Sequence, residues 1–481
     1  MKEISSWKLE AKLEDSDRYF YHTSDINRVD DGSICYVIGR KGSGKTAIAE
    51  FLYHRSAHNH FADRLSFKNF PFNDLYGLTN DRYTPPNQYI TLWKWLIYCH
   101  IAKLMIKNEA IDGALRNTLA QVFPVEPIQT LARSISRLTN PGLKFSFLGA
   151  EISGSMSSVG TVNDSSWIER CDVLEDLIAK NLDQSIYTIV FDELDEDYKS
   201  ADSSSTSRHY LELLTSLFKA VQDVKATFPA GRYGIRPIIF LRNDIYDILK
   251  DPDKTKWNDL RLDLHWNLQS IRNLMGFRIG RANDPDSPPL DFGEALKLAA
   301  RHYESMKPIR NRSLIEWIGS QTLSRPRDYV SFFRISAESS LQRNAPFIDA
   351  LGMLSSVTPY STYLRSEVQD ELSTALPEIR DVLNVIARIG RPLFSFANFN
   401  DEYERYIKPN PSRRPAEEVL AMLFRFGVIG NRTSIGGTVS GLRSGELEFN
   451  PELSINVLRG LLPALRIKDE HGQSFAGGLL T

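Results

Sequence analysis

Short apolar runs alternate with amphipathic stretches along the first half of the chain. Residues 34–38 form an apolar run, which is followed by a glycine-rich segment and then by helix-forming residues; this order predicts a strand, a loop and a helix. Two further apolar runs, Ile186–Phe191 and Ile238–Leu241, end in polar residues and predict buried parallel strands. Between them, Ser207–Phe228 repeats apolar residues at helical spacing. The pattern predicts an α/β fold with a parallel sheet.

The second half of the chain carries mainly helical patterns. Three of them, Gly293–Met306, Ser313–Ser320 and Arg327–Glu338, predict a small helical lid. A later series of helices, followed by the strand-like residues 445–449, resembles a winged helix. The helices of that series are Glu378–Ile389, Phe396–Ile407 and Ala416–Phe426.

The length of 481 residues favours two or three domains, because single cores usually stop growing near ~250 to 300 residues. We expect an ATPase core with an insertion, a helical lid and a winged-helix-like domain. Their expected bounds are 1–290 for the core, about 76–183 for the insertion, 291–370 for the lid and 371–481 for the last domain. In the insertion we assign the aromatic residues around Trp93 to the core, and alternation over Lys144–Ile152 predicts a small hairpin.

Composition narrows the class of protein. With 42% hydrophobic, 25% charged and 11% aromatic residues, the chain is neither collagen-like nor disordered nor a disulfide scaffold. A net charge of −2 gives no global basic field, so any binding of nucleic acid or acidic membrane has to be local. The cysteines Cys35, Cys99 and Cys171 are too far apart in sequence for a zinc or redox motif.

Two segments bear on location. The first residues of the chain have no apolar run of the kind that secretory signals carry. The apolar stretch Tyr89–Ile106 is interrupted by Lys94, His100 and Lys103, which favours a buried helix over a membrane span. We therefore expect a cytoplasmic protein that does not contact a membrane.

The glycine-rich segment fits the pattern G-x-x-x-x-G-K-[ST] of phosphate-binding loops. In such a loop, successive N–H groups and the start of the following helix face the phosphates. We expect Lys45 to reach the β and γ phosphates and the Thr46 hydroxyl to bind Mg²⁺. The expected nucleotide-binding residues are Gly39, Arg40, Lys41, Gly42, Ser43, Gly44, Lys45, Thr46 and Ala47.

The strand Ile186–Phe191 ends in an acidic cluster. Ligands bind at the carboxyl ends of strands in open α/β sheets, so we expect Asp192 to hold Mg²⁺ together with Thr46, and Glu193 to act as general base. Asp195 follows in the same cluster, and we assign it a loop or helix-capping role because one Mg²⁺ needs only one or two protein carboxylates.

The strand Ile238–Leu241 ends in Arg242, Asn243 and Asp244. A polar group at this tip would hydrogen-bond the γ-phosphate or the attacking water. The alternative is an ordinary turn, because Asn-Asp is a common turn pair.

These motifs resemble, in their order along the chain, those of AAA+ and related STAND-type P-loop ATPases. The segment from Trp257 to Ile279 looks like a part of ORC/Cdc6-type ATPases, and the signatures RKGSGKT and DELD resemble bacterial KAP and defence-associated ATPases. The resemblance covers residues 15–340 in patches. It implies a P-loop parallel-sheet ATPase core with ATP and Mg²⁺ as ligands.

The resemblance also implies roles for single residues. Asn243 matches the sensor 1 position, and Arg327 matches the sensor 2 arginine, for which Arg325 competes. Arg261, in an Arg-Leu pair within a helical context, matches an arginine finger that acts on a neighbouring subunit; a surface salt bridge is the alternative.

Two functions follow from this pattern. The first is an ATP-driven switch that assembles on or remodels a partner, as the likeness to STAND and bacterial antiphage defence ATPases implies, with a homo-oligomer or an effector protein as partner. The second is a DNA-binding, initiator-like ATPase of the ORC/Cdc6 type. We prefer the first because Glu417 and Glu418 open the expected DNA-reading helix, and carboxylates there repel phosphate.

Overall fold

The computed structural model describes residues 1–55, 57–67, 75, 79–80, 82–85, 87–123, 167–195, 205–302, 313–407, 413–433, 437–441 and 448–468. The chain forms two compact units. The first, here the parallel-sheet unit, comprises His22–Arg40 and Gly44–Leu264. The second, here the C-terminal unit, comprises Met1–Tyr21, Lys41–Ser43 and His265–Thr481. The three domains expected from the sequence stay a prediction.

A five-stranded parallel sheet forms the centre of the parallel-sheet unit, in the order β2-β3-β4-β1-β5. The strands are β1 (Tyr36–Ile38), β2 (His60–Ser66), β3 (Ile186–Asp192), β4 (Ile235–Leu241) and β5 (Arg261–Asp263). The predicted α/β class with a parallel sheet is therefore confirmed. The sequence pattern located β1, β3 and β4 but did not delimit β2 or β5.

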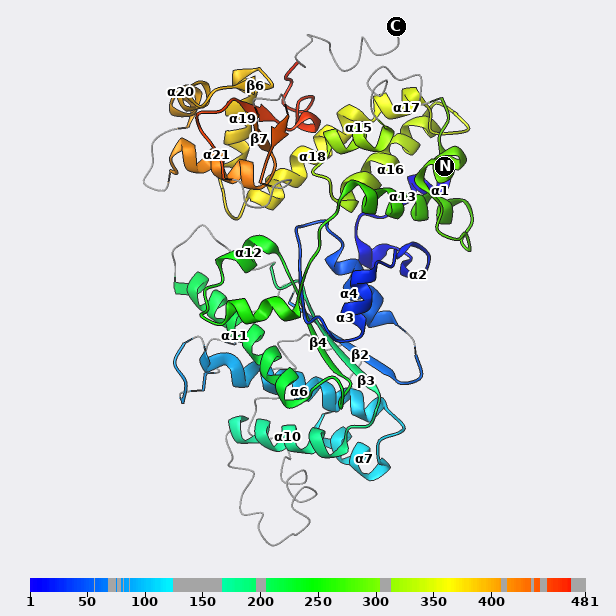
Figure 1. Ribbon diagram of the computed structural model, residues 1–481, viewed down its shortest axis with the longest axis vertical. Coiled ribbons are helices and arrows are strands. Elements are labelled where there is room, and N and C mark those ends of the chain that lie inside the picture. The colour runs from blue at the N-terminus through cyan, green and yellow to red at the C-terminus, as the bar shows by residue number, and fades with distance from the viewer. Residues whose placement is uncertain are drawn as a thin grey trace. The chain divides into compact units, whose positions relative to one another are not determined.

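Helices cover both faces of this sheet (Figure 1). The connection from β1 to β2 crosses the sheet in the direction opposite to the other connections, so right-handed crossovers put α4 (Lys45–His54) on one face and α11 (Ser205–Thr227) on the other. The helices α6 (Ile90–Lys107) and α10 (Trp167–Asn181) pack on the α11 side. The other helices described in this unit are α3 (Ser24–Asp30), η2 (Asn87–Tyr89), α7 (Gly113–Val122), α12 (Asn243–Ile248) and η4 (Lys254–Leu260).

The aromatic side chains of helix α6 belong to the core of the parallel-sheet unit. Trp93, Trp95 and Tyr98 of α6 are buried, as expected, and the Trp93 indole N–H donates to the Leu213 carbonyl at 2.9 Å. Helix α6 buries most of its residues because it packs between the sheet and the helices α10 and α11. The hairpin predicted at Lys144–Ile152 lies outside the described residues.

The C-terminal unit is mainly helical. The three predicted lid helices correspond to α14 (Phe292–Ala299), α15 (Leu314–Gln321) and α16 (Pro326–Gln342), although α14 ends earlier than expected. The other helices before the small sheet are α1 (Lys2–Ser5), η1 (Ala11–Leu13), α2 (Ser16–Tyr19), α13 (Leu268–Asn283), α17 (Ala350–Ser355) and α18 (Val357–Leu372).

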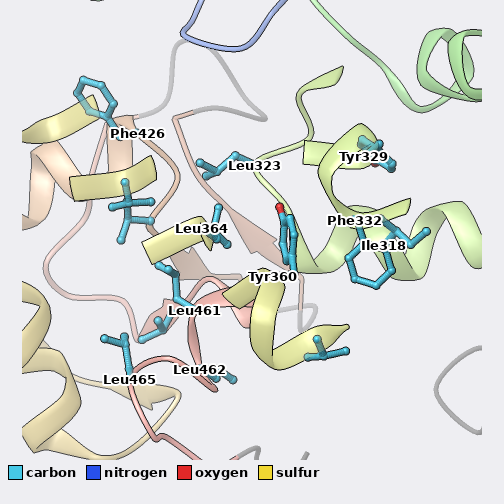
Figure 2. Packing of buried hydrophobic residues seen from close by; sticks show 14 of the residues in the cluster. Ile318, Leu323, Tyr329, Phe332, Tyr360, Leu364, Phe426, Leu461, Leu462 and Leu465 are labelled. Carbon is cyan, nitrogen blue, oxygen red and sulfur yellow. The ribbon is translucent and has the colours of Figure 1, made fainter. Parts of the chain in front are cut away.

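A four-stranded antiparallel sheet, in the order β6-β9-β7-β8, lies near the end of the chain. Its strands are β6 (Leu393–Phe394), β7 (Ile429–Arg432), β8 (Thr438–Val439) and β9 (Ile455–Val457), and its helices are α19 (Ile379–Ile389), α20 (Phe396–Tyr406) and α21 (Ala416–Arg425). The predicted strand over 445–449 falls partly outside the described residues, and the winged-helix interpretation stays a prediction. After β9, the segment with η7 (Arg459–Leu461) packs on α18, and Figure 2 shows Leu461 beside Leu364.

In the part of the chain that the structure describes, no helix combines the length and the apolar character needed to cross a membrane.

Candidate nucleotide site

The glycine-rich loop joins β1 to α4, as the sequence predicted. Gly42 and Gly44 have φ angles of 80° and 102°, which residues with a side chain rarely adopt. A Cβ atom at Gly42 would also lie 3.2 Å from the Arg327 Cβ atom. Gly44 is the residue immediately before α4, so the loop delivers its N–H groups directly to the start of a helix.

Lys45 is folded back onto the loop that precedes it. Its ammonium group donates to the Gly39 carbonyl at 2.8 Å and to the Arg40 carbonyl at 3.0 Å. Burial lowers the pKa of Lys45 from its ordinary value of 10.5, and the nearby Asp195 carboxylate opposes this shift. Burial thus removes water from the charged Lys45 side chain, which makes the charged form less favourable. Its two backbone acceptors are groups that phosphate oxygens can replace.

The carboxyl ends of three strands meet at one edge of the sheet. In the register of the parallel pairs, Ile38 lies opposite Leu241, and Phe191 lies opposite Ile239. The loop after β1, the acidic end of β3 and the polar residues after β4 therefore share this edge. Strand β1 is also the point where the direction of the connections reverses, which is where ligands bind in open α/β sheets.

Asp192 and Glu193 form the acidic end of β3. Asp192 is 3% exposed. Glu193 has a φ of 61°, in the left-handed region, and its carboxylate accepts a hydrogen bond from the Ser66 hydroxyl at the end of β2. A side-chain-bearing residue in this conformation costs roughly 1–3 kcal/mol and persists only where its surroundings fix it. The backbone thus turns sharply at the residue expected to act as general base.

The polar tip of β4 is occupied by an ion pair. The Arg242 guanidinium binds the Asp244 carboxylate at 2.6 and 3.0 Å, and it lies 3.8 Å from the Asp195 carboxylate. Asn243 opens α12 at the same sheet edge. Its sensor role stays a prediction.

Arg261 lies in a strand, so the expected helical context is wrong. It is the first residue of β5, the outermost strand of the sheet, which pairs in parallel with β1. The Arg261 guanidinium binds Asp263 at 2.8 Å and lies over the Tyr246 ring, 5.0 Å from its centroid. These contacts are those of the salt-bridge alternative, and the finger role stays a prediction.

Two arginines at the start of α16 differ in their surroundings. Arg325 is 3% exposed, and its guanidinium binds Asp328 at 3.0 Å, Glu371 at 2.7 Å and the Lys41 carbonyl at 3.0 Å. The Arg327 side chain is half-buried and lies 3.6 Å from Glu367. Arg325 is thus fixed by several contacts and Arg327 is held more loosely, and the sensor 2 role of Arg327 stays a prediction.

The predicted site residues fall in both units. At the carboxyl edge of the parallel sheet lie Gly39, Arg40, Gly44, Lys45, Thr46, Ala47, Asp192, Glu193 and Asn243. The loop residues 41–43, together with Arg327, belong to the C-terminal unit. Sequence reasoning did not identify Ser66 or Trp266, whose indole N–H donates to the Ser43 carbonyl at 2.8 Å. Their contacts, made across 127 and 223 residues of chain, leave no local signal.

The residues at this edge suit a magnesium triphosphate. Among the described residues, no group of three or more His, Cys, Asp or Glu side chains could hold a metal ion by itself. Magnesium commonly keeps waters and phosphate oxygens as ligands, so one carboxylate such as Asp192 and one hydroxyl such as Thr46 suffice. The Ser43 hydroxyl is buried and has no hydrogen-bond partner in the described part of the chain, which leaves a polar group available within the loop.

The comparisons with known proteins include a distant structural likeness. No protein-family model matches the chain, and no curated protein matches it. The chain is similar to a solved structure of the ORC2 protein of Aeropyrum pernix, described as ADPNP-ADP complexes, with 12% identity and a TM-score of 0.31 over 92% of this chain and 90% of that one. A likeness of this size carries no conclusion about fold or function.

Proposed function

We propose that this protein binds and hydrolyses ATP with Mg²⁺ and uses the nucleotide state as a switch. One observation carries the proposal: the glycine-rich loop with Lys45 follows β1 at the same sheet edge at which Asp192 and Glu193 end β3. A phosphate-binding loop alone would support binding. An acidic pair at the same edge adds the groups that hold a metal and activate water.

The loop and Lys45 bind the phosphates in this proposal. The Lys45 ammonium exchanges the carbonyls of Gly39 and Arg40 for phosphate oxygens, which restores its charge-assisted hydrogen bonds. Thr46 and Asp192 hold the metal, which when bound supplies positive charge to the developing negative charge on the phosphates.

Glu193 takes the proton of the attacking water. Its carboxylate accepts from Ser66, so this contact has to loosen, or the water has to use the second carboxylate oxygen, before the proton moves. Glu193 is thus held by a neighbouring strand, and hydrolysis is slow compared with binding. Slow hydrolysis suits a timer.

The carboxy-terminal elements favour a protein partner over DNA. Arg413 binds Glu404 at 2.6 Å, and Arg414 binds Glu418, so two basic residues of this region are already paired with carboxylates. Helix α21 also has Glu417 and Glu418 in its first turn. We therefore propose assembly on, or remodelling of, a protein partner, with antiphage defence as the setting that the motif resemblance suggests.

Nucleotide turnover tests the enzymatic part of the proposal. Phosphate release is measured with Mg²⁺ and ATP for the wild type, for Lys45→Ala and for Glu193→Gln, with and without duplex DNA. We expect slow turnover in the wild type, strongly reduced turnover in both variants, and no stimulation by DNA. A wild type that neither binds nor hydrolyses ATP refutes the proposal, and a rate that rises with DNA and falls steeply with salt favours the initiator-like function instead.

Particle size tests the switch. Light scattering of the wild type is compared with ADP and with a slowly hydrolysed ATP analogue. We expect a different particle size, or a different partner-bound fraction, with the analogue. Identical behaviour in both nucleotide states would leave an ATPase without the proposed switch.

A further inference from the structure

Three successive carbonyl groups at the apex of the glycine-rich loop each accept a hydrogen bond from the C-terminal unit. The Lys41 carbonyl accepts from the Arg325 guanidinium at 3.0 Å. The Gly42 carbonyl accepts from the Arg327 backbone N–H at 3.5 Å. The Ser43 carbonyl accepts from the Trp266 indole N–H at 2.8 Å. Residues 41–43 belong to the same compact unit as these donors.

The direction of these carbonyls fixes the direction of the amides. In a planar trans peptide, the C=O and the following N–H point to opposite sides. The N–H groups of Gly42, Ser43 and Gly44 therefore point away from Arg325, Arg327 and Trp266. Three neighbouring N–H groups that point the same way form a nest for an anion.

The amides on this side are available. Within the described part of the chain, the N–H groups of Gly42, Ser43 and Gly44 donate to no backbone carbonyl. Ser43 is 3% exposed, and its hydroxyl likewise has no hydrogen-bond partner among the described residues. The loop thus has its acceptors occupied and its donors open, the arrangement that suits a phosphate and not a cation.

The two side-chain donors are themselves held in place. Arg325 is buried between the carboxylates of Asp328 and Glu371, which accept from its Nε, Nη1 and Nη2 atoms. Trp266 precedes a capping box, in which Asn267 and Ser270 exchange hydrogen bonds of 2.8 and 2.9 Å at the start of α13. Because Arg325 and Trp266 are held by these contacts, they can fix the orientation of the loop carbonyls that they bind.

We propose that Trp266 and Arg325 are positioning residues for the phosphate nest: by holding the carbonyls of residues 41 and 43, they aim the N–H groups of Gly42 and Gly44 at the nucleotide. This inference rests on the proposed function, because it names residues that shape the same site. Neither side chain touches the phosphates. Their effect is on nucleotide affinity, and the metal ligands and general base remain in place.

Trp266→Phe tests the inference, because phenylalanine keeps an aromatic ring and removes the N–H donor. Dissociation constants for Mg–ATP and Mg–ADP are measured by calorimetry, and kcat is measured at saturating ATP. We expect both dissociation constants to rise about fivefold, the loss of one hydrogen bond, with kcat within about twofold of wild type. The equal effect on ATP and ADP follows because both carry the β-phosphate that the nest would hold.

Trp317→Phe is the matched control. Trp317 lies buried in α15 of the same unit and packs edge-on against Phe332. This variant should lower the melting temperature and leave both dissociation constants unchanged. If it weakens nucleotide binding as much as Trp266→Phe does, the effect is one of general destabilisation and the inference is wrong.

Arg325→Lys gives a second, independent variant that keeps the buried charge. It shortens the reach to the Lys41 carbonyl, so we expect weaker binding of ATP and ADP with kcat again retained. If both variants are folded and bind nucleotide as the wild type does, the positioning role is refuted while the proposed function stands. If the wild type itself binds neither nucleotide, the proposed function fails first, and the positioning role fails with it.

Discussion

The two sheets of this protein differ in where the ends of their strands lie. In the parallel sheet, β2, β3 and β4 are seven residues long and all run the same way, so their carboxyl ends collect at one edge. In the antiparallel sheet, the strands have two to four residues and neighbouring ends alternate in direction. A parallel arrangement gathers the residues that follow several strands at one place, and an antiparallel one disperses them.

The basic side chains near the two sheets also differ in the partners that they bind. Among the described residues, Lys45, beside the parallel sheet, donates to two backbone carbonyls that a phosphate can replace. Arg413 and Arg414, near the small sheet, are bound to the carboxylates of Glu404 and Glu418. This contrast supports the proposal that a charged ligand binds at the parallel sheet, and that the region of the small sheet acts through contacts of another kind.

Among the variants that test this contrast, we expect removal of the Lys45 charge to have the largest effect on ATP binding. Lys45→Ala is expected to weaken ATP binding roughly a hundredfold or more, because a charge-assisted contact to the phosphates is lost. Arg413→Ala, which removes one charge near the small sheet, is the matched control and should leave affinity unchanged. Equilibrium binding of a fluorescent ATP analogue measures both, and equal losses in the two variants would contradict the contrast between the two sheets.

Glu193→Gln should separate binding from chemistry. The amide keeps the shape of the carboxylate and cannot accept the proton of water, so we expect hydrolysis to fall roughly 10²- to 10⁴-fold while ATP affinity stays within a few-fold. Single-turnover phosphate release and calorimetry supply the two numbers. Hydrolysis at the parental rate would remove Glu193 from the mechanism.

Lys45 should also make nucleotide binding depend on pH. Burial lowers the pKa of this ammonium in the free protein, and a bound triphosphate stabilises the charged form and raises it again. ATP affinity is therefore highest below the lowered pKa and falls as pH rises through it toward 10.5, by up to about tenfold per pH unit. Calorimetry above about pH 8, beyond the titration of phosphate groups near pH 6, measures the accompanying proton uptake. Uptake that persists in Lys45→Ala would assign it to another group.

Releasing Glu193 from its neighbouring strand should give a smaller effect. Ser66→Ala removes the hydroxyl that donates to the Glu193 carboxylate, so we expect hydrolysis to rise about two- to fivefold with unchanged ATP affinity. Ser216→Ala is a suitable control, since that buried hydroxyl bonds the Leu213 carbonyl within α11. A lower rate in Ser66→Ala would mean that Ser66 holds Glu193 in its working position.

The sequence predicted those parts of the site that have a local pattern. Glycines at fixed spacing after an apolar run mark the loop, and acidic residues after Ile186–Phe191 mark the end of β3, because strand, turn and helix propensities act over a few residues. Strand β2 has no such pattern, because it contains His60, Asp63 and Arg64. Each of these polar residues has a partner from another element, such as His100, which lies 2.6 Å from Asp63.

The residues that hold the site residues in place could not be predicted, because they also lack a local sequence pattern. Trp266 and Ser66 act through single hydrogen bonds to residues far away in sequence, and an isolated tryptophan or serine has no periodicity. Arg325 and Arg327 are two positions apart in one motif, and the burial of Arg325 between Asp328 and Glu371 distinguishes it from Arg327 in the folded protein. Burial and long-range pairing are properties of the folded chain.

A crystal structure of the protein with Mg²⁺ and a slowly hydrolysed ATP analogue tests the nucleotide site most directly. We predict that the β-phosphate contacts the N–H groups of Gly42, Ser43 and Gly44, with Lys45 turned from the carbonyls of residues 39 and 40 to the phosphates. We also predict the metal beside Asp192. A nucleotide bound elsewhere, or a loop that keeps Lys45 on its own carbonyls at saturating analogue, would contradict the proposed site.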